Sequence, residues 1–97
     1  MKEGIEPNTV YRKSADQTSA NIGDDEVVLQ MVDGVYYSLN STGREVWQQL
    51  DQPQSLDSLA NHLTEKYDVD RIACLEAVHD LLEQMESAGL VSRQKPE

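Results

Sequence analysis

The sequence predicts an α+β domain in which strands come first and helices follow. Residues 26–39 are rich in β-branched and aliphatic side chains around a central Asp33-Gly34 pair, the pattern of a β-hairpin. Residues 41–91 then repeat apolar side chains at helical spacing in three segments, each preceded by a helix-capping residue. A chain of 97 residues has room for one such domain with a modest core.

The two ends of the chain lack any apolar periodicity. Residues 1–9 and 92–97 carry Pro, Gly and charge, so we expect flexible tails around a single domain that spans residues 10–91. Val10–Lys13 is expected to be a first strand, and the polar residues 14–25 a loop that returns to the sheet.

Two apolar segments are expected to form the arms of the hairpin, Glu26–Val32 and Val35–Leu39. Asp33-Gly34 would supply the two positive-φ positions of a two-residue type I′ turn. In that register Val28 lies opposite Leu39, and apolar side chains lie on both faces of the sheet. A sheet with one solvated face alternates more cleanly between apolar and polar residues, so something should cover part of each face.

Three helices are expected after the hairpin. The first begins at Asn40 or Ser41, the second after Ser55, and the third after Asp70, because these side chains can accept hydrogen bonds from the first turn. Gly89 stands where a left-handed residue ends the third helix. The segment at 51–54, with a proline, separates the first two helices.

The third helix has a wider apolar surface than a core alone requires. Its apolar positions, from Ala77 through Leu81, Val78 and Leu82 to Leu75, cover roughly 160° of the circumference, against about 100° for a minimal stripe. Two interpretations remain open. The helix is central and contacts both the sheet and the other helices, or it also forms one wall of a binding groove.

The charge of the chain restricts its partners. Eighteen acidic and eight basic residues give a formal net charge of −10 at pH 7. Because a negative field repels phosphate backbones and anionic lipids, neither nucleic acid nor a membrane is expected as a partner. No apolar run approaches the roughly 20 residues that span a bilayer, and no secretion signal opens the sequence, so we expect a cytoplasmic protein.

Nucleophilic and metal-binding residues are scarce. Cys74 is the sole cysteine, which excludes an internal disulfide, and together with His62 and His79 it offers no zinc-ligand spacing. Hydrolase, metalloprotease, phosphate-loop and C-x-x-C motifs are absent, so we expect no enzyme, no catalytic residues, no metal and no cofactor. Trp47 and Cys74 are interpreted as core residues, and His79 as a partly exposed hydrogen-bonding residue.

An ordered series of short motifs resembles the PqqD-like family, which includes recognition elements of ribosomally made, modified peptides. The series begins with Gly-Val-Tyr-Tyr-Ser-Leu-Asn at 34–40, followed by Gly43, Trp47 and Leu50. It continues with the loop around Pro53, Ser-Leu-Asp-Ser-Leu at 55–59, Tyr-Asp-Val-Asp at 67–70, and Ala-Gly-Leu-Val at 88–91. The resemblance therefore covers residues 10–91.

The resemblance implies a small winged-helix-like fold, with an N-terminal three-stranded antiparallel sheet followed by a three-helix bundle. It also implies that the leader of a precursor peptide adds as an extra strand beside the third strand, in a groove walled by the third helix. The peptide-binding residues implied in this sequence are Val35, Tyr36, Tyr37, Ser38, Leu39, Leu75, Val78, His79 and Leu82. Tyr36 and Tyr37 alternate across the strand, and the sequence leaves open which one faces the ligand.

The preferred functional hypothesis is a leader-peptide recognition protein of lasso-peptide biosynthesis. Its expected partners are the precursor peptide and a leader peptidase or other modifying enzyme, and we expect a monomer or weak dimer. The alternatives are a peptide chaperone for a radical enzyme in quinone-cofactor (PQQ-like) biosynthesis and a winged-helix transcription regulator. The last is disfavoured because the third helix has Arg71 as its one basic residue against Glu76, Asp80, Glu83 and Glu86.

Overall fold

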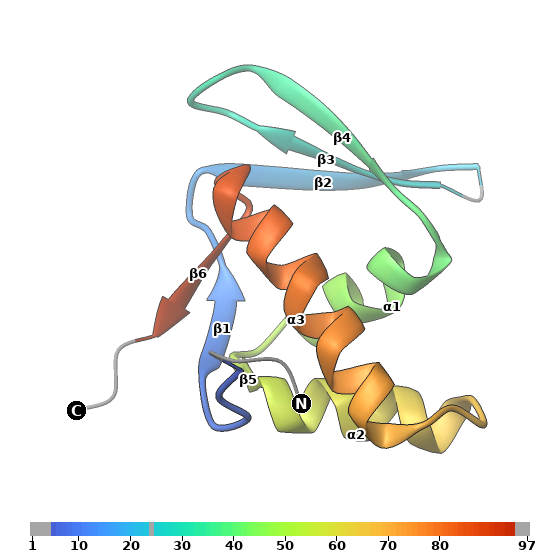
Figure 1. Cartoon of the computed structure of the whole chain (residues 1–97). Coiled ribbons are helices and arrows are strands. Elements are labelled where there is room, and N and C mark those ends of the chain that lie inside the picture. Colours follow the sequence, from blue (N-terminus) through green and yellow to red (C-terminus); the bar gives the residue numbers. More distant parts are fainter. Residues whose placement is uncertain (1–4, 24, 95–97) are drawn as a thin grey trace.

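Two three-stranded antiparallel sheets and three helices make up the fold in the computed structural model, which describes residues 5–23 and 25–94 (Figure 1). The first sheet has the strand order β5-β1-β6, with β1 at Val10–Lys13, β5 at Gln54–Ser55 and β6 at Val91–Gln94. The second has the order β2-β3-β4, with β2 at Gln17–Ile22, β3 at Asp25–Gln30 and β4 at Val35–Leu39. The predicted α+β class, with a three-stranded antiparallel sheet followed by three helices, is confirmed.

One strand of that sheet differs from the prediction. Val10–Lys13 is a strand, but it pairs with β5 and β6 instead of the hairpin. The third strand of the hairpin sheet is β2, which lies in the segment expected to be a loop. The residues of β2 are polar or small apart from Ile22 at its end, and nearly all are exposed, so the segment lacks the apolar alternation that predicts a strand. Backbone pairing with β3, from Gln17 opposite Gln30 to Ile22 opposite Asp25, organises them instead.

The hairpin register is shifted by two residues from the prediction. Val28 lies opposite Tyr37, and residues 31–34 form a four-residue loop. The type I′ turn is wrong because Gly34, at φ +70°, is the only residue of the loop with positive φ. Gln30 holds the longer loop: its carbonyl accepts from the Gly34 N–H at 2.8 Å, and its side-chain oxygen accepts from the Asp33 N–H at 2.7 Å. A shift of two preserves which face each side chain occupies, so the predicted faces are correct.

The three helices begin at the predicted caps. They are α1 at Ser41–Gln49, α2 at Leu56–Lys66 and α3 at Arg71–Ser87. Asn40 Oδ1 accepts the N–H of Gly43 at 2.8 Å, and Ser55 Oγ accepts the N–H of Ser58 at 3.1 Å. At α3 the Asp70 carboxylate accepts from the first turn in the same way. Each bond satisfies a backbone donor that the helix leaves unpaired, which explains why local sequence was sufficient to locate these starts.

The core lies between α3, the other two helices and the inner faces of the sheets (Figure 1). Trp47 is fully buried and Cys74 is buried, both as predicted. His79 is also buried, so its predicted partial exposure is wrong: position 79 lies next to the buried Val78 on the inward side of α3. The fully buried larger side chains are Tyr11, Val28, Val46, Trp47, Leu50, Leu56, Leu59, Val78, Leu82 and Leu90.

The packed part of the chain extends beyond residues 10–91 at both ends. Ile5 is buried, and the Pro7 carbonyl accepts the N–H of Asp57 at 2.9 Å, which ties residues 5–9 to the start of α2. At the other end β6 continues to Gln94 alongside β1. The remainder of the two expected tails, 1–4 and 95–97, lies outside the described residues. Within the described ranges, no helix combines the length and apolar character needed to cross a bilayer.

Candidate functional site

One edge of the β2-β3-β4 sheet is open beside α3. Within the described residues β4 pairs with β3 alone, so its other edge presents backbone N–H and C=O groups without a strand partner. Gln30 fixes the hairpin above the C-terminal end of α3, because its side chain packs so closely on Gly89 that a Cβ there would lie 2.9 Å from Gln30 Nε2. Gly89 has φ +78°, and its lack of a side chain brings the hairpin and the helix together.

A cavity of about 270 Å³, here called the β4–α3 groove, runs between this edge and the helix. Half-buried apolar side chains, among them Leu39 and Leu81, form much of its lining. Its wall from β4 and the start of α1 consists of Tyr37, Ser38, Leu39, Asn40 and Gly43, and its wall from α3 and the following turn consists of Leu81, Gln84, Met85, Ala88 and Leu90. The groove thus combines unpaired strand backbone with apolar side-chain surface.

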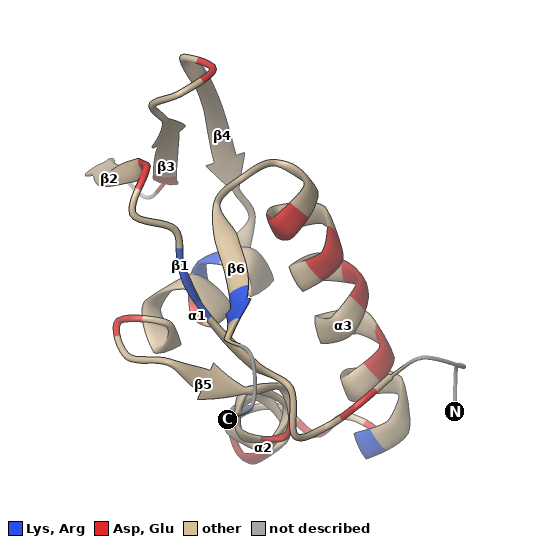
Figure 2. Ribbon diagram, turned by 90° about the vertical axis from the view of Figure 1, so that its left-hand side faces the viewer, with Lys and Arg blue, Asp and Glu red and all other residues tan. Residues whose placement is uncertain are grey.

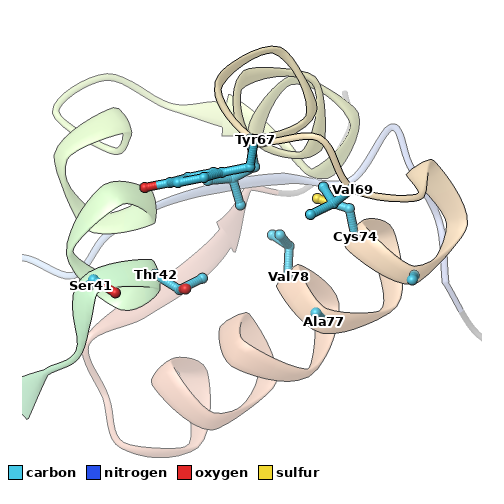
Figure 3. Close-up of a pocket in the computed structure, with 9 residues that line it drawn as sticks. Ser41, Thr42, Tyr67, Val69, Cys74, Ala77 and Val78 are labelled. Atoms are coloured by element: carbon cyan, nitrogen blue, oxygen red, sulfur yellow. The ribbon is translucent and has the colours of Figure 1, made fainter.

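A second cavity, of about 420 Å³, opens at the junction of α2 and α3 (Figure 3). We call it the junction pocket. Tyr67 forms one side of it, with its hydroxyl directed toward α1, and lies opposite Ala77 and Val78 of α3. Tyr67 and Val69 are 45 % and 48 % exposed, so apolar surface is open to a ligand here. The pocket is lined by Ser41, Thr42, Leu63, Tyr67, Val69, Ala73, Cys74, Ala77 and Val78.

The two cavities adjoin along the same two elements. At the start of α1, Asn40 and Gly43 line the groove, while the residues between them, Ser41 and Thr42, line the junction pocket. On α3, the residues at 73 and 77 line the pocket, and those at 81, 84 and 88 line the groove. Spacings of three and four residues place these positions on one face of a helix. We call this face of α3 the groove stripe: Ala73, Ala77, Leu81, Gln84 and Ala88.

The structure separates the predicted residues of β4 into two sets. Tyr37, Ser38 and Leu39 line the β4–α3 groove, whereas Val35 and Tyr36 line neither cavity. Tyr37 is half-buried against the core, and Tyr36 is 70 % exposed on the opposite face. Tyr37 is therefore the tyrosine that lines the groove, and which of the two faces a ligand stays a prediction.

The predicted residues of α3 lie mostly beneath the groove. Leu75, His79 and Leu82 are at most 6 % exposed and line neither cavity, while Val78 lines the junction pocket at 1 % exposure. Their role in binding a ligand stays a prediction. The helix presents Leu81 to the groove instead, one residue or about 100° from Leu82. The wide apolar arc of α3 was the sequence signal that could have indicated Leu81, Ala77 and Ala88. One part of the arc packs into the core and the other part lines the two cavities, so the helix is both central and a cavity wall.

The thiol nearest the cavities has little nucleophilic character. Cys74 lines the junction pocket and is buried, and this burial raises the pKa of its thiol above the ordinary value. The thiol Sγ lies 3.7 Å from the Ala60 carbonyl oxygen, to which it can donate. A thiol that stays protonated at neutral pH is a poor nucleophile, so Cys74 serves as apolar lining.

A group of three potential metal ligands lies on α3 apart from both cavities. Nδ1 of His79 is 3.5 Å from a carboxylate oxygen of Asp80, and Nε2 is 3.5 Å from one of Glu83. The ligand atoms of the three residues lie within 4.8 Å of one another. One imidazole and two carboxylates fall short of the four ligands of a structural zinc site, and we assign no metal to them.

Comparison with known proteins gives one family and two similar structures. The family model of coenzyme PQQ synthesis protein D (PqqD) matches residues 26–91. No curated protein sequence matches the chain. The structure is similar to "TbiB1 in Complex with the TbiA(beta) Leader Peptide", with a TM-score of 0.80 and 24% identity over 88% of this chain and 99% of that one. It is also similar to "Lasso peptide synthetase B1 complexed with the leader peptide", with a TM-score of 0.76 and 25% identity over 84% of this chain and 96% of the other.

Proposed function

Because the chain belongs to the PqqD family, we propose that it recognises the leader of a ribosomally made precursor peptide and presents that precursor to a maturation enzyme. The leader adds as a strand to the open edge of β4 and lies along the groove stripe of α3. The maturation step is lasso-peptide biosynthesis, and the enzyme is a leader peptidase or another modifying enzyme. We place this activity in the cytoplasm, where ribosomes release the precursor.

The observation that carries the proposal is the open β4 edge beside the apolar lining of the β4–α3 groove. An extended peptide can bond its backbone to the edge while alternate side chains enter the two cavities. Four backbone hydrogen bonds contribute about 0.5–1.5 kcal/mol each, whereas micromolar affinity corresponds to about 8 kcal/mol. Ordering a flexible peptide costs still more, so apolar anchors must supply the difference. The groove and the junction pocket offer two places for them.

The similar structures support the choice of ligand and pathway. Both carry a leader peptide according to their descriptions, and one is described as a lasso peptide synthetase B1. Each of them is covered by this chain almost to its full length. The family model, which matches residues 26–91, includes both β4 and α3.

In the proposed mechanism the protein accelerates a reaction that it does not itself catalyse. Holding the leader keeps the rest of the precursor at a high effective concentration near the active site of the enzyme. The sequence lacks the usual nucleophile and metal-ligand motifs. Burial raises the pKa of the Cys74 thiol, which makes it a poor nucleophile. We therefore assign the chemistry to the partner.

A second candidate function has support from the family match. The matching model is that of a coenzyme PQQ synthesis protein, so the same site could serve as a peptide chaperone for a radical enzyme. The two candidates share the β4 edge and differ in the enzyme that receives the peptide. Genes beside the one for this chain distinguish them: a protease favours the lasso route, and a radical enzyme favours the chaperone role.

Calorimetric titration with the leader of the precursor encoded nearby tests the proposal. We expect one leader to bind each monomer with micromolar affinity or better, as is typical of a strand held by about four hydrogen bonds and two anchors. A scrambled leader of identical composition is the matched control, because it keeps charge and hydrophobicity but loses the order of the anchors. Equal affinity for the two peptides, or heat from neither, would refute leader recognition.

A further inference from the structure

The outward face of the β2-β3-β4 sheet carries apolar side chains that nothing in the described chain covers. Strand alternation places the buried Val28 on the inner face and the half-buried Val27 and Leu29 on the outer one. Cross-strand pairing adds Tyr36 opposite Leu29 and Ala20 opposite Val27. We call Ala20, Ile22, Val27, Leu29 and Tyr36 the outer sheet face. In Figure 1 the helices lie on the other side of this sheet.

Exposed apolar surface concentrates at this sheet. Ile22 and Tyr36 are 63 % and 70 % exposed, and Met31 and Val32 in the adjoining hairpin loop are 52 % and 71 % exposed. Two other large exposed apolar residues, Tyr67 and Val69, already belong to the junction pocket. Clusters of this kind, in contrast to single exposed side chains, mark interaction sites.

The charge of the region identifies the chemistry of the partner. Residues 14–43 contain five acidic residues and no Lys or Arg, and among the described residues Asp16, Asp25 and Asp33 are exposed. Figure 2 accordingly shows acidic positions but no basic ones on β2, β3, β4 and their turns. A second copy of the chain would bring like charges together around the apolar patch, which disfavours self-association. The complementary surface is apolar with a rim of Lys and Arg.

Continuity with the β4 edge links this face to the leader. A strand added beside β4 extends the sheet. Every second side chain of the leader then lies on the same face of the sheet as Tyr36 and Leu29. The intervening side chains point toward the groove with Tyr37 and Leu39. A protein on the outer face therefore leaves the groove free and can contact the bound leader directly.

We propose that the outer sheet face docks the maturation enzyme. The matching surface of that enzyme is apolar with a rim of Lys and Arg, and it contacts both the sheet and the outward side chains of the bound leader. The inference rests on the proposed function and adds the location of the enzyme and a reason for ordered assembly. The enzyme binds the leader-loaded protein more tightly than the free one, because only the loaded sheet presents the complete surface. Salt weakens the contact, since acidic and basic rims attract one another.

Binding to the modifying enzyme encoded beside the gene for this chain tests the inference, with an active-site variant of the enzyme so that the leader stays intact. Leu29→Lys puts a cation in the outer sheet face, and its long side chain is tolerated on a strand surface. Ile72→Lys makes the same change at a residue that is 52 % exposed at the start of α3, away from the sheet. We expect Leu29→Lys to weaken enzyme binding at least tenfold and Ile72→Lys to change it less than twofold.

Leader titration of the same variants separates the inference from the proposed function. Leader affinity within twofold of wild type shows that Leu29→Lys is folded and that the loss concerns the enzyme alone. Asp33→Asn is a milder second variant, expected to weaken enzyme binding two- to threefold and to reduce its salt dependence. Equal enzyme affinity for wild type and Leu29→Lys would overturn the docking site, as would a wild-type dimer that Leu29→Lys dissociates. Failure of the leader to bind wild type would instead overturn the proposed function.

Discussion

The two apolar faces of α3 differ in what covers them. Leu75 and Leu82 face inward and are almost completely buried against the rest of the core. Leu81 and Ala88, on the groove stripe, are only half-buried and line an open cavity. Leu81 and Leu82 are adjacent leucines, yet about 100° of helical rotation separates a position that lines the groove from a position in the core. An apolar residue on this helix can therefore be assigned a role only when its rotation relative to β4 is known.

The largest expected effect is on stability, from truncation on the buried face. Leu82→Ala leaves a cavity in a fully buried position and should lower the free energy of unfolding by about 2–5 kcal/mol, as urea denaturation would measure. The matched variant Leu81→Ala should cost less than about half as much, because the side chain is already partly open to solvent. Equal losses in the two variants would show that the faces are not distinct.

The second effect is on leader binding, from a charge placed on the groove stripe. Leu81→Asp should weaken leader affinity at least tenfold, about 1.4 kcal/mol, because a bound apolar anchor would then face a carboxylate. Ile72→Asp is the control, since it adds the same charge to α3 outside both cavities. Calorimetry on both variants, with thermal unfolding to verify folding, decides the matter. Undiminished affinity of Leu81→Asp would remove the stripe from the site.

A third effect should appear in the peptide. N-methylation of single leader amides removes one donor at a time, and a strand paired to the edge of β4 bonds through every second residue. We expect affinity to fall by about threefold to tenfold at alternate positions, in keeping with about 0.5–1.5 kcal/mol per bond, and little between them. A loss that follows every third or fourth position would indicate a helical leader instead.

The smallest effect concerns the tie between α1 and α2, away from the groove stripe. The Lys66 ammonium hydrogen-bonds the Glu45 carboxylate and lowers the pKa of that carboxyl below its ordinary value of 4.5, with His62 Nε2 also 3.4 Å from the carboxylate. A lowered pKa stabilises the fold above pH 4.5, and this contribution is lost as the pH falls through the folded-state pKa.

Glu45→Gln should therefore lower the melting temperature near neutral pH, by about 3 °C or less for so exposed a partner as Lys66. Melting curves should converge with those of wild type once the pH is well below 4.5. Leader affinity should not change. A difference from wild type that persists in acid would mean that the substitution acts through packing and not through the charge.

Features set by local chemistry could be predicted from the sequence. Asn40, Ser55 and Asp70 start the helices where expected, because a cap acts on its own first turn. The faces of the hairpin were predictable for the same reason, since alternation is a property of each strand. The hairpin register was not, because the Gln30 side chain bonds Asp33 and holds a four-residue loop that the Asp33-Gly34 pair does not indicate.

Features set by distant partners could not be predicted. β2 is a strand because β3 lies beside it, and its own residues carry no apolar alternation. The groove stripe depends on which side of α3 faces β4. The packing of Gln30 on Gly89, together with the rest of the core, determines that side. The wide apolar arc indicated that α3 had a second surface. Neither the length nor the composition of the helix, however, gives its rotation relative to β4.

Hydrogen exchange of the two edge strands tests leader addition most directly. The β2-β3-β4 sheet has one edge at Val35–Leu39, beside the groove, and the other at Gln17–Ile22, away from it. On saturation with the leader, we expect alternate amides of Val35–Leu39 to become strongly protected, while those of Gln17–Ile22 exchange as before. Protection confined to Gln17–Ile22, or no change at Val35–Leu39 with the leader bound, would contradict strand addition at β4.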